Sequence, residues 1–152
     1  MIPKLRCPRP LIDETLGHLR AGGSANCETV VLWLGIVRDG SAEVREVHRP
    51  EQRVDTDFFL IPQEGVRAMM RRLTETRFQI LAQVHSHPEA AFHSSTDDAC
   101  AIIRHVGAVS IVIPYFAVGT DSTTFANRAA TYQLDAFDHW IAVDFAAVVE
   151  VI

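Results

Sequence analysis

The chain has 152 residues, the usual size of one domain, and its 48% apolar and 22% charged residues exclude a disordered protein. A net charge of -5 argues against nucleic acid and anionic membranes as partners, and no apolar run reaches the roughly 18 residues of a membrane helix. Three widely spaced cysteines exclude a disulfide framework and, with no secretory signal in residues 1–10, predict a cytoplasmic location.

The first half of the chain starts with a predicted helix and continues with strands. Apolar residues at helical spacing predict a helix at residues 10–21, which we expect Gly22 and Gly23 to end. An almost unbroken apolar run predicts a strand at residues 28–37 that is covered on both faces. Asp39-Gly40 then predicts a hairpin turn.

The rest of the chain alternates between the two patterns. We expect strands at residues 44–48, 58–61, 78–84 and 108–114, and shorter β-prone pieces at 123–127 and 130–134. A loop is expected at 49–57, and helices are expected from Pro62 and at 99–106. On the helix from Pro62, Arg67, Arg71 and Arg72 are predicted to face solvent. No linker or repeat divides the chain, so residues 1–152 are predicted to form a single α/β domain.

The stretch HSHPEAAFHSSTDD, residues 85–98, carries the strongest chemical signal. His85 and His87 alternate at the end of a predicted strand, so both imidazoles project from one face and can share an ion. Asp98 adds an oxygen donor eleven residues after His87. Two histidines, one carboxylate and a position left for water are typical of a hydrolytic zinc site.

A structural interpretation of the same residues stays open. Ser95-Thr96-Asp97-Asp98 also approximates a helix capping box, with Ser95 as the N-cap. The two interpretations are compatible, because a residue in the first turn of a helix can direct its carboxylate at an ion. His93, which has no ligand spacing, is predicted to be a surface residue.

The pattern His85-x-His87, seven residues, then Ser95-x-x-Asp98 resembles the motif of the JAMM, or MPN, metalloproteases. In that family a glutamate on an earlier strand completes the site, and ETVVLWLG, residues 28–35, matches its place with Glu28. The chain departs from the family at Val30, Val31 and Trp33, where relatives tend to carry small residues. Ser94 and Asp97 form an overlapping pair, but the family's spacing favours Ser95 with Asp98.

The resemblance implies a cytidine-deaminase-like three-layer α/β/α sandwich with a mixed central sheet. It also implies that His85, His87 and Asp98 hold Zn²⁺, that Glu28 is the general base and that Ser95 donates to the oxyanion. The implied activity is a zinc isopeptidase that removes or processes a ubiquitin-like modifier, with E1-like and E2-like proteins as partners, as in bacterial antiviral defence systems. Residues 49–57 and 117–128 are candidates for contacting the modifier.

Three other functions stay open within the resemblance. The chain could be a sulfur-carrier maturation protease, or a non-catalytic MPN scaffold, although scaffolds usually lack a ligand that is kept here. A DNA-repair branch bears a similar motif, but the acidic balance of this chain disfavours it.

Overall fold

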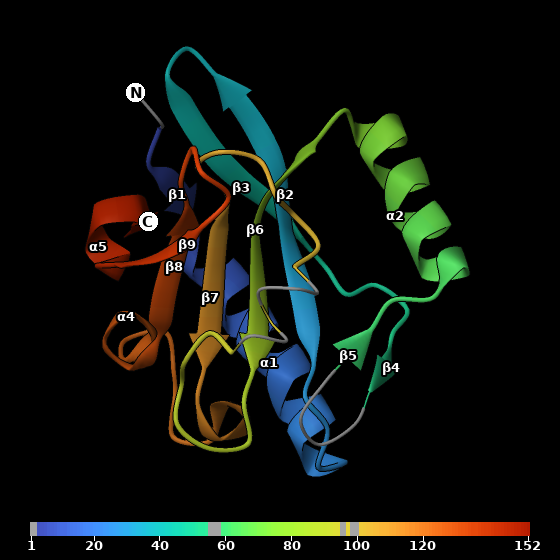
Figure 1. The fold of residues 1–152 in the computed structure, drawn as a ribbon, viewed down its shortest axis with the longest axis vertical. Coiled ribbons are helices and arrows are strands. Elements are labelled where there is room, and N and C mark those ends of the chain that lie inside the picture. The colour runs from blue at the N-terminus through green and yellow to red at the C-terminus, as the bar shows by residue number, and fades with distance from the viewer. Residues whose placement is uncertain (1–2, 55–58, 95–96, 98–100) are drawn as a thin grey trace.

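Eight strands of one mixed sheet organise the computed structural model, which describes residues 3–54, 59–94, 97 and 101–152 (Figure 1). The sheet contains β1 (Leu5–Cys7), β2 (Val30–Arg38), β3 (Ser41–His48), β6 (Gln79–Ser86), β7 (Val109–Ile113), β8 (Ala130–Leu134), β9 (Trp140–Val143) and β10 (Val149–Val151). Their order is β10-β1-β3-β2-β6-β7-β8-β9, and a separate pair is formed by β4 (Arg53–Val54) and β5 (Phe59–Leu60). β6 pairs antiparallel with β2 and parallel with β7, so the predicted mixed sheet is confirmed.

The helix α1 (Arg9–Ser24) covers one face of this sheet. Ile12, Leu16 and Leu19 form its buried stripe, and the indole of Trp33 donates a 2.9 Å hydrogen bond to the hydroxyl of Thr15. Trp33 therefore fills the core between α1 and β2 without leaving its N–H unsatisfied.

Gly22 and Gly23 do not end α1 as predicted, because the helix continues to Ser24. Their role is close packing. A Cβ added at Gly22 would lie 1.8 Å from the Thr29 hydroxyl oxygen, and one at Gly23 would lie 2.4 Å from the Cβ of Phe116. Glycine at these positions lets the helix approach the segments that carry the candidate site.

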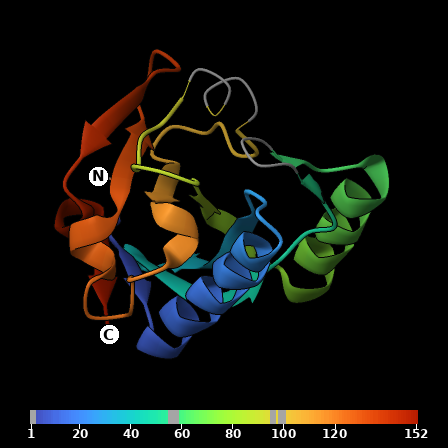
Figure 2. The same cartoon turned by 90° about the horizontal axis from the view of Figure 1, so that it is seen from below.

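The second long helix, α2 (Gln63–Thr76), packs on the opposite face of the sheet (Figure 2). Met69 contacts Leu32 and Leu34, which alternate with the α1-facing residues of β2. Arg72 does not simply face solvent as predicted, because its Nε donates a 2.9 Å hydrogen bond to Glu46 on β3. The helix is thus fastened to the sheet by apolar packing and by one partly exposed ion pair.

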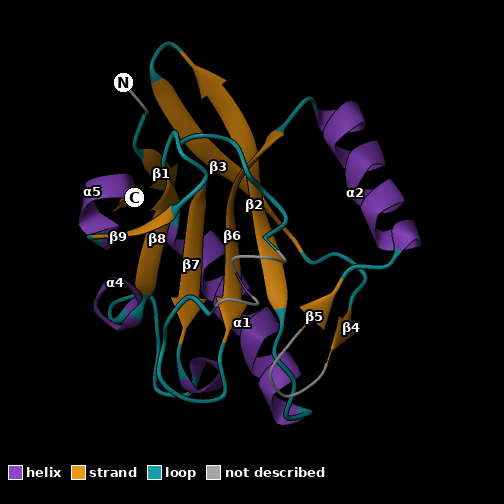
Figure 3. Ribbon diagram, viewed as in Figure 1, coloured by secondary structure: helices purple, strands orange, loops and turns teal. Residues whose placement is uncertain are grey.

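Three local predictions were wrong, as the secondary structure in Figure 3 shows. Residues 101–106, the described part of the helix predicted at 99–106, contain no helix; the Ile102 amide donates to the side chain of Gln83 instead. Residues 123–127 do not form a strand, because α4 (Phe125–Arg128) begins there. It follows a turn in which the Asp121 carboxylate accepts hydrogen bonds from the Thr123 and Thr124 amides. The predicted loop 49–57 contains β4.

The remaining elements are short. A 3-10 turn, η1 (Tyr115–Ala117), follows β7, and α5 (Phe145–Val148) precedes β10. The described residues between β6 and β7 (87–94, 97 and 101–108) are together called the motif loop below. Within the described residues, no helix is both long enough and apolar enough to cross a membrane.

The buried thiol of Cys7 predicts a pH dependence of stability. Burial raises its pKa to about 12, whereas an unfolded thiol ionises near pH 8.5. Below about pH 8.5 both states keep the proton; above it only the unfolded chain loses it, so the free energy of unfolding falls by up to about 1.4 kcal/mol per pH unit.

Urea unfolding between pH 8 and 10 measures this effect. Cys7→Ala should show a shallower loss of stability over that range than the wild type. Cys27→Ala, at a partly exposed thiol, is the control and should keep the wild-type slope. Equal slopes for Cys7→Ala and the wild type would contradict the assignment.

Candidate metal centre

Four ligand-bearing side chains meet at the end of β6 and form what we call the four-residue cluster. Glu28, His85, His87 and Asp97 each offer a ligand atom, and these atoms lie within 4.8 Å of one another. All four side chains are buried, with Glu28 only 2% exposed. Three of the four are residues that the sequence singled out.

The sheet fixes the two histidines. His85 lies in β6 between Val30 of β2 and Val112 of β7, so it is held by strands on both sides. His87 follows the end of β6, and its amide donates a 2.9 Å hydrogen bond to the carbonyl of Ile113. The extended backbone from His85 to His87 therefore directs both imidazoles to one face, as predicted.

Glu28 precedes β2 and is held by a two-way contact between Thr29 and Ser86. The Ser86 amide donates to the Thr29 carbonyl at 3.0 Å, and the Thr29 amide donates to the Ser86 hydroxyl at 3.1 Å. Since Ser86 separates the two histidines, this contact aligns the glutamate with both of them. The bulky Val30, Val31 and Trp33 all pack in the core and leave Glu28 in the cluster.

The carboxylate of Asp97 bridges the two imidazoles. Its Oδ1 lies 3.2 Å from His85 Nε2, and its Oδ2 lies 3.1 Å from His87 Nε2. Glu28 Oε1 lies farther away, at 4.0 Å from His85 Nε2 and 3.9 Å from His87 Nε2. Asp97 is thus in direct contact with both histidines, whereas Glu28 Oε1 lies 0.8 Å farther from each imidazole nitrogen.

Asp97 belongs to the overlapping pair that the family's spacing had disfavoured. The Ser94 amide donates to Asp97 Oδ2 at 2.8 Å, and the Asp97 amide donates to the Ser94 hydroxyl at 3.0 Å. These reciprocal bonds are those of a capping box, so capping and ligand geometry coexist in one pair. Ser95 and Asp98, the predicted pair, lie outside the described residues, and their assignment stays a prediction.

Burial and neighbouring charges have opposing effects on the pKa values of the cluster. Burial lowers the pKa of His85 and outweighs the contribution of Asp97. Burial also lowers the pKa of His87, but its hydrogen bond with Asp97 and the charge of Glu28 raise that pKa above its usual value. Burial by itself would raise the pKa of Asp97, yet hydrogen bonds with both imidazoles hold that pKa well below its usual range.

The donor set also fits a divalent metal ion. Near pH 7 the Asp97 carboxylate is ionised and His85 is neutral, which are the forms that bind metals. Imidazole nitrogens with carboxylate oxygens are ligands that zinc accepts. A cation would also compensate the negative charge of Glu28 and Asp97, which burial makes costly.

A cleft of about 270 Å³ opens beside the cluster. Its lining includes Glu28, His87, Ala90, Phe92 and Ser94. Phe92 is 53% exposed, and its ring lies edge-on to the His87 imidazole at 4.8 Å between centroids. The cleft gives a substrate access to two members of the cluster.

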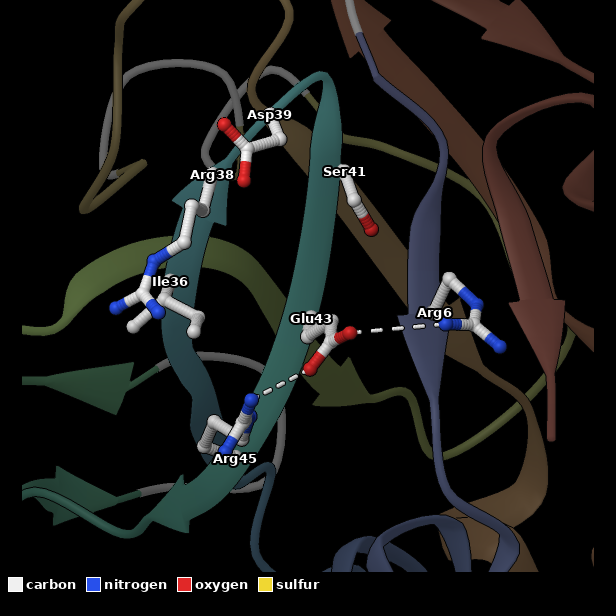
Figure 4. Close-up of a pocket in the computed structure, with 7 residues that line it drawn as sticks. All are labelled: Arg6, Ile36, Arg38, Asp39, Ser41, Glu43 and Arg45. Atoms are coloured by element: carbon white, nitrogen blue, oxygen red, sulfur yellow. Dashed lines mark hydrogen bonds and ion pairs between the residues drawn. The ribbon is translucent and has the colours of Figure 1, made fainter.

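A hollow of about 360 Å³ also lies on the sheet face of β1, β2 and β3 (Figure 4). Glu43 stands at its centre and pairs with Arg45 at 2.6 Å and with Arg6 at 3.6 Å. None of its lining residues belongs to the four-residue cluster. We therefore place the candidate site in the smaller cleft.

His93 is not the surface residue that the sequence predicted. Its Nε2 lies 3.1 Å from the hydroxyl of Ser110, and its ring packs against Tyr132 and Trp140 at 5.0 and 5.2 Å between centroids. The buried Gln83 amide donates to the same hydroxyl at 3.0 Å. Gln83 also accepts the Ile102 amide, so this network fastens both ends of the motif loop to β6 and β7.

Ser110 is therefore predicted to stabilise the motif loop. Ser110→Ala would leave the buried Gln83 amide without that acceptor and should lower the free energy of unfolding by about 1–3 kcal/mol. Urea denaturation in the presence of a chelator measures the change without metal binding. Ser24→Ala, at an exposed hydroxyl, is the control and should stay within about 0.5 kcal/mol of the wild type. An equally small change for Ser110→Ala would contradict the role of this network.

Comparison with known proteins supplies the family. Residues 8–127 match the family described as prokaryotic homologs of the JAB domain. A protein of Sinorhizobium fredii named probable metalloprotease y4jG is 35% identical over 149 residues, which cover 95% of this chain and 90% of that protein.

Solved structures share the fold at low identity. A protein of Desulfitobacterium hafniense aligns with a TM-score of 0.67 at 14% identity, covering 97% of this chain and 92% of its own. A protein of Salinibacter ruber aligns with a TM-score of 0.59 at 19% identity, covering 91% of this chain and 88% of its own. A JAB1/MPN domain protein of Archaeoglobus fulgidus aligns with a TM-score of 0.54 at 19% identity, covering 97% of this chain and 98% of its own.

The predicted fold class and family resemblance are thereby confirmed. The family match spans most of the sequence, and the similarity to the relative from Sinorhizobium fredii runs along nearly all of it. This chain belongs to the metalloprotease-like family of prokaryotic JAB-domain proteins.

Proposed function

We propose that this protein is a zinc-dependent peptidase that cleaves an amide or isopeptide bond made by a ubiquitin-like modifier. The observation that carries the proposal is the buried four-residue cluster, in which two imidazoles and two carboxylates converge beside an open cleft. The family and the name of the Sinorhizobium relative support peptide-bond hydrolysis. The modifier, and E1-like and E2-like partners, follow from the family resemblance alone.

His85, His87 and Asp97 are the residues that would hold the ion. Their nitrogen and oxygen atoms contact one another directly, and imidazole nitrogens together with a carboxylate oxygen are ligands that zinc accepts. When bound, such an ion supplies Lewis-acid polarisation of a carbonyl and lowers the pKa of a water molecule toward about 7. The protein's share of the chemistry then falls to the groups around the ion.

Glu28 is the residue that would move protons. Its Oε1 lies about 4 Å from both imidazoles, slightly farther than the oxygens of Asp97, and Glu28 lines the cleft. From there its carboxylate can take a proton from the attacking water and later pass it to the leaving amine nitrogen. Fixing Glu28 through Thr29 and Ser86 keeps this base aligned with the ligands.

A serine hydroxyl would assist the oxyanion. The family's spacing assigns this role to Ser95, which lies outside the described residues. In the pair that the structure describes, the Ser94 oxygen accepts the Asp97 amide and Ser94 lines the cleft. Its O–H can therefore donate toward a substrate while its oxygen holds Asp97 in place.

Paired substitutions identify the carboxylate ligand. Asp97→Asn should lower zinc affinity at least about tenfold, because a ligand to the ion is removed. Asp98→Asn is the matched neighbour and should keep wild-type affinity. Zinc content by mass spectrometry and zinc-induced shifts in Tm measure both variants. Loss of zinc in Asp98→Asn with retention in Asp97→Asn would reverse the assignment in favour of the family's spacing.

Substitution of Glu28 separates catalysis from metal binding. Glu28→Gln should keep zinc but lower hydrolysis by about 10²- to 10⁴-fold, because the amide cannot take a proton. Cleavage of linear and lysine-linked ubiquitin-like fusions, repeated after chelation, measures the activity. Unchanged cleavage in Glu28→Gln would overturn the role of the base, and loss of zinc would make Glu28 a ligand instead.

A further inference from the structure

A second hollow, of about 320 Å³, adjoins the cleft of the candidate metal centre. Its walls are mainly the methyl groups of Ala90, Ala91, Ala129 and Ala130, and its lining includes Tyr115 and Arg128. Ala90 lines both this hollow and the cleft, so the two share a wall. A chain lying across the metal centre could thus reach the alanine-lined hollow.

A strained backbone turn forms one side of this hollow. Tyr115, Phe116 and Ala117 have φ angles of 53°, 50° and 65°, a left-handed conformation that costs on the order of 1–2 kcal/mol per non-glycine residue. The turn is fastened to the motif loop, because the Phe116 amide donates to the His87 carbonyl at 2.8 Å and the Tyr115 amide donates to the Glu89 carbonyl at 3.0 Å. Strain that surrounding contacts maintain is concentrated at functional sites.

Arg128 is the one charged residue that lines the hollow. Its Nε donates a 2.9 Å hydrogen bond to the hydroxyl of Thr120, and its guanidinium carbon lies 6.0 Å from the centre of the Tyr115 ring. Within the described part of the chain, no carboxylate forms an ion pair with Arg128. The guanidinium is therefore oriented by neutral groups and keeps donors for a ligand.

We infer that this hollow is a substrate subsite that binds a carboxylate. Small walls leave room for an acidic side chain, and an oriented guanidinium can form two parallel hydrogen bonds with its oxygens. A chain-terminal carboxylate has the same chemistry. The inference rests on the proposed peptidase function, and it names Arg128 and Tyr115 as specificity determinants of the substrate.

Binding of short peptides tests this inference without turnover. The ¹⁵N-labelled, zinc-loaded full chain is titrated with acetyl-Ala-Ala-Glu-Ala-amide and its Gln counterpart. Tetra-alanine is titrated both as the free acid and as the amide. Comparison of these two peptides shows whether the hollow binds a terminal carboxylate, whereas the Glu and Gln peptides test a side-chain carboxylate. We expect the Glu or the free-acid peptide to bind roughly tenfold more tightly than its neutral counterpart, with amide shifts at Ala129 and Ala130.

Variants of the hollow decide the result. Arg128→Gln should abolish the preference for the carboxylate. Arg128→Lys should keep only part of it, because an ammonium group cannot form the two parallel hydrogen bonds of a guanidinium. Arg67→Gln, on the exposed side of α2, is the matched control and should keep the full preference. Tyr115→Gly removes the ring from a position that glycine tolerates, so it should weaken the preference without lowering Tm.

Each outcome bears on the subsite separately from the catalytic proposal. Equal binding of charged and neutral peptides to the wild type would overturn the inference, as would an unchanged preference in Arg128→Gln. Repeating the titration with Glu28→Gln should give the same preference, because the hollow does not include the base. Failure of hydrolysis alone would leave this binding result standing, whereas failure of the preference would leave the metal assignment intact.

Discussion

The contact of one carboxylate with two imidazoles is the interaction on which the candidate site depends. Asp97 reaches His85 and His87 at about the same distance, although it comes from the segment between β6 and β7 and they come from a strand and its end. A buried carboxylate is stable only when its charge is compensated, so Asp97 must lie against the two imidazoles. This requirement fixes the position of the motif loop relative to β6. The capping bonds between Ser94 and Asp97 then fix the direction of the carboxylate.

The sheet gives this contact a rigid base. β6 is held by β2 on one side and β7 on the other, so His85 cannot shift without breaking two strand pairings. The backbone of His87 is bonded to both Ile113 and the strained turn at Phe116. The same turn packs closely against Gly23 of α1. A helix on the far side of the sheet therefore supports the segment that carries a ligand.

The motif loop has a second anchorage that does not depend on the cluster. The hydroxyl of Ser110 joins Gln83 to His93, and Gln83 also accepts the Ile102 amide. Buried polar groups that are fully hydrogen-bonded favour one arrangement over others. The loop is thus held near its beginning and its end, while Asp97 lies between these two points.

The sequence alone determined the larger elements and most of the chemistry. Helical periodicity located α1 and α2, and largely apolar runs located β2, β6 and β7, because each pattern is long enough to be recognised. Alternation along β6 placed His85 and His87 together, and the family resemblance added Glu28, which the structure brings within 4 Å of both. These features are local or are carried by a motif.

Tertiary structure decided the features that depend on partners distant in the chain. Two overlapping Ser-x-x-Asp pairs are equivalent to local propensity. Among the described residues it is the contact with the two imidazoles that identifies Asp97, while Asp98 lies outside them. His93 is partly buried, and not a surface residue as predicted, because it contacts Ser110, Tyr132 and Trp140. Residues 101–106 gave up their predicted helix because Gln83 offered an acceptor outside the helix pattern. In each case a contact far along the chain outweighed a weak local preference, since local propensities amount to less than about 1 kcal/mol per residue.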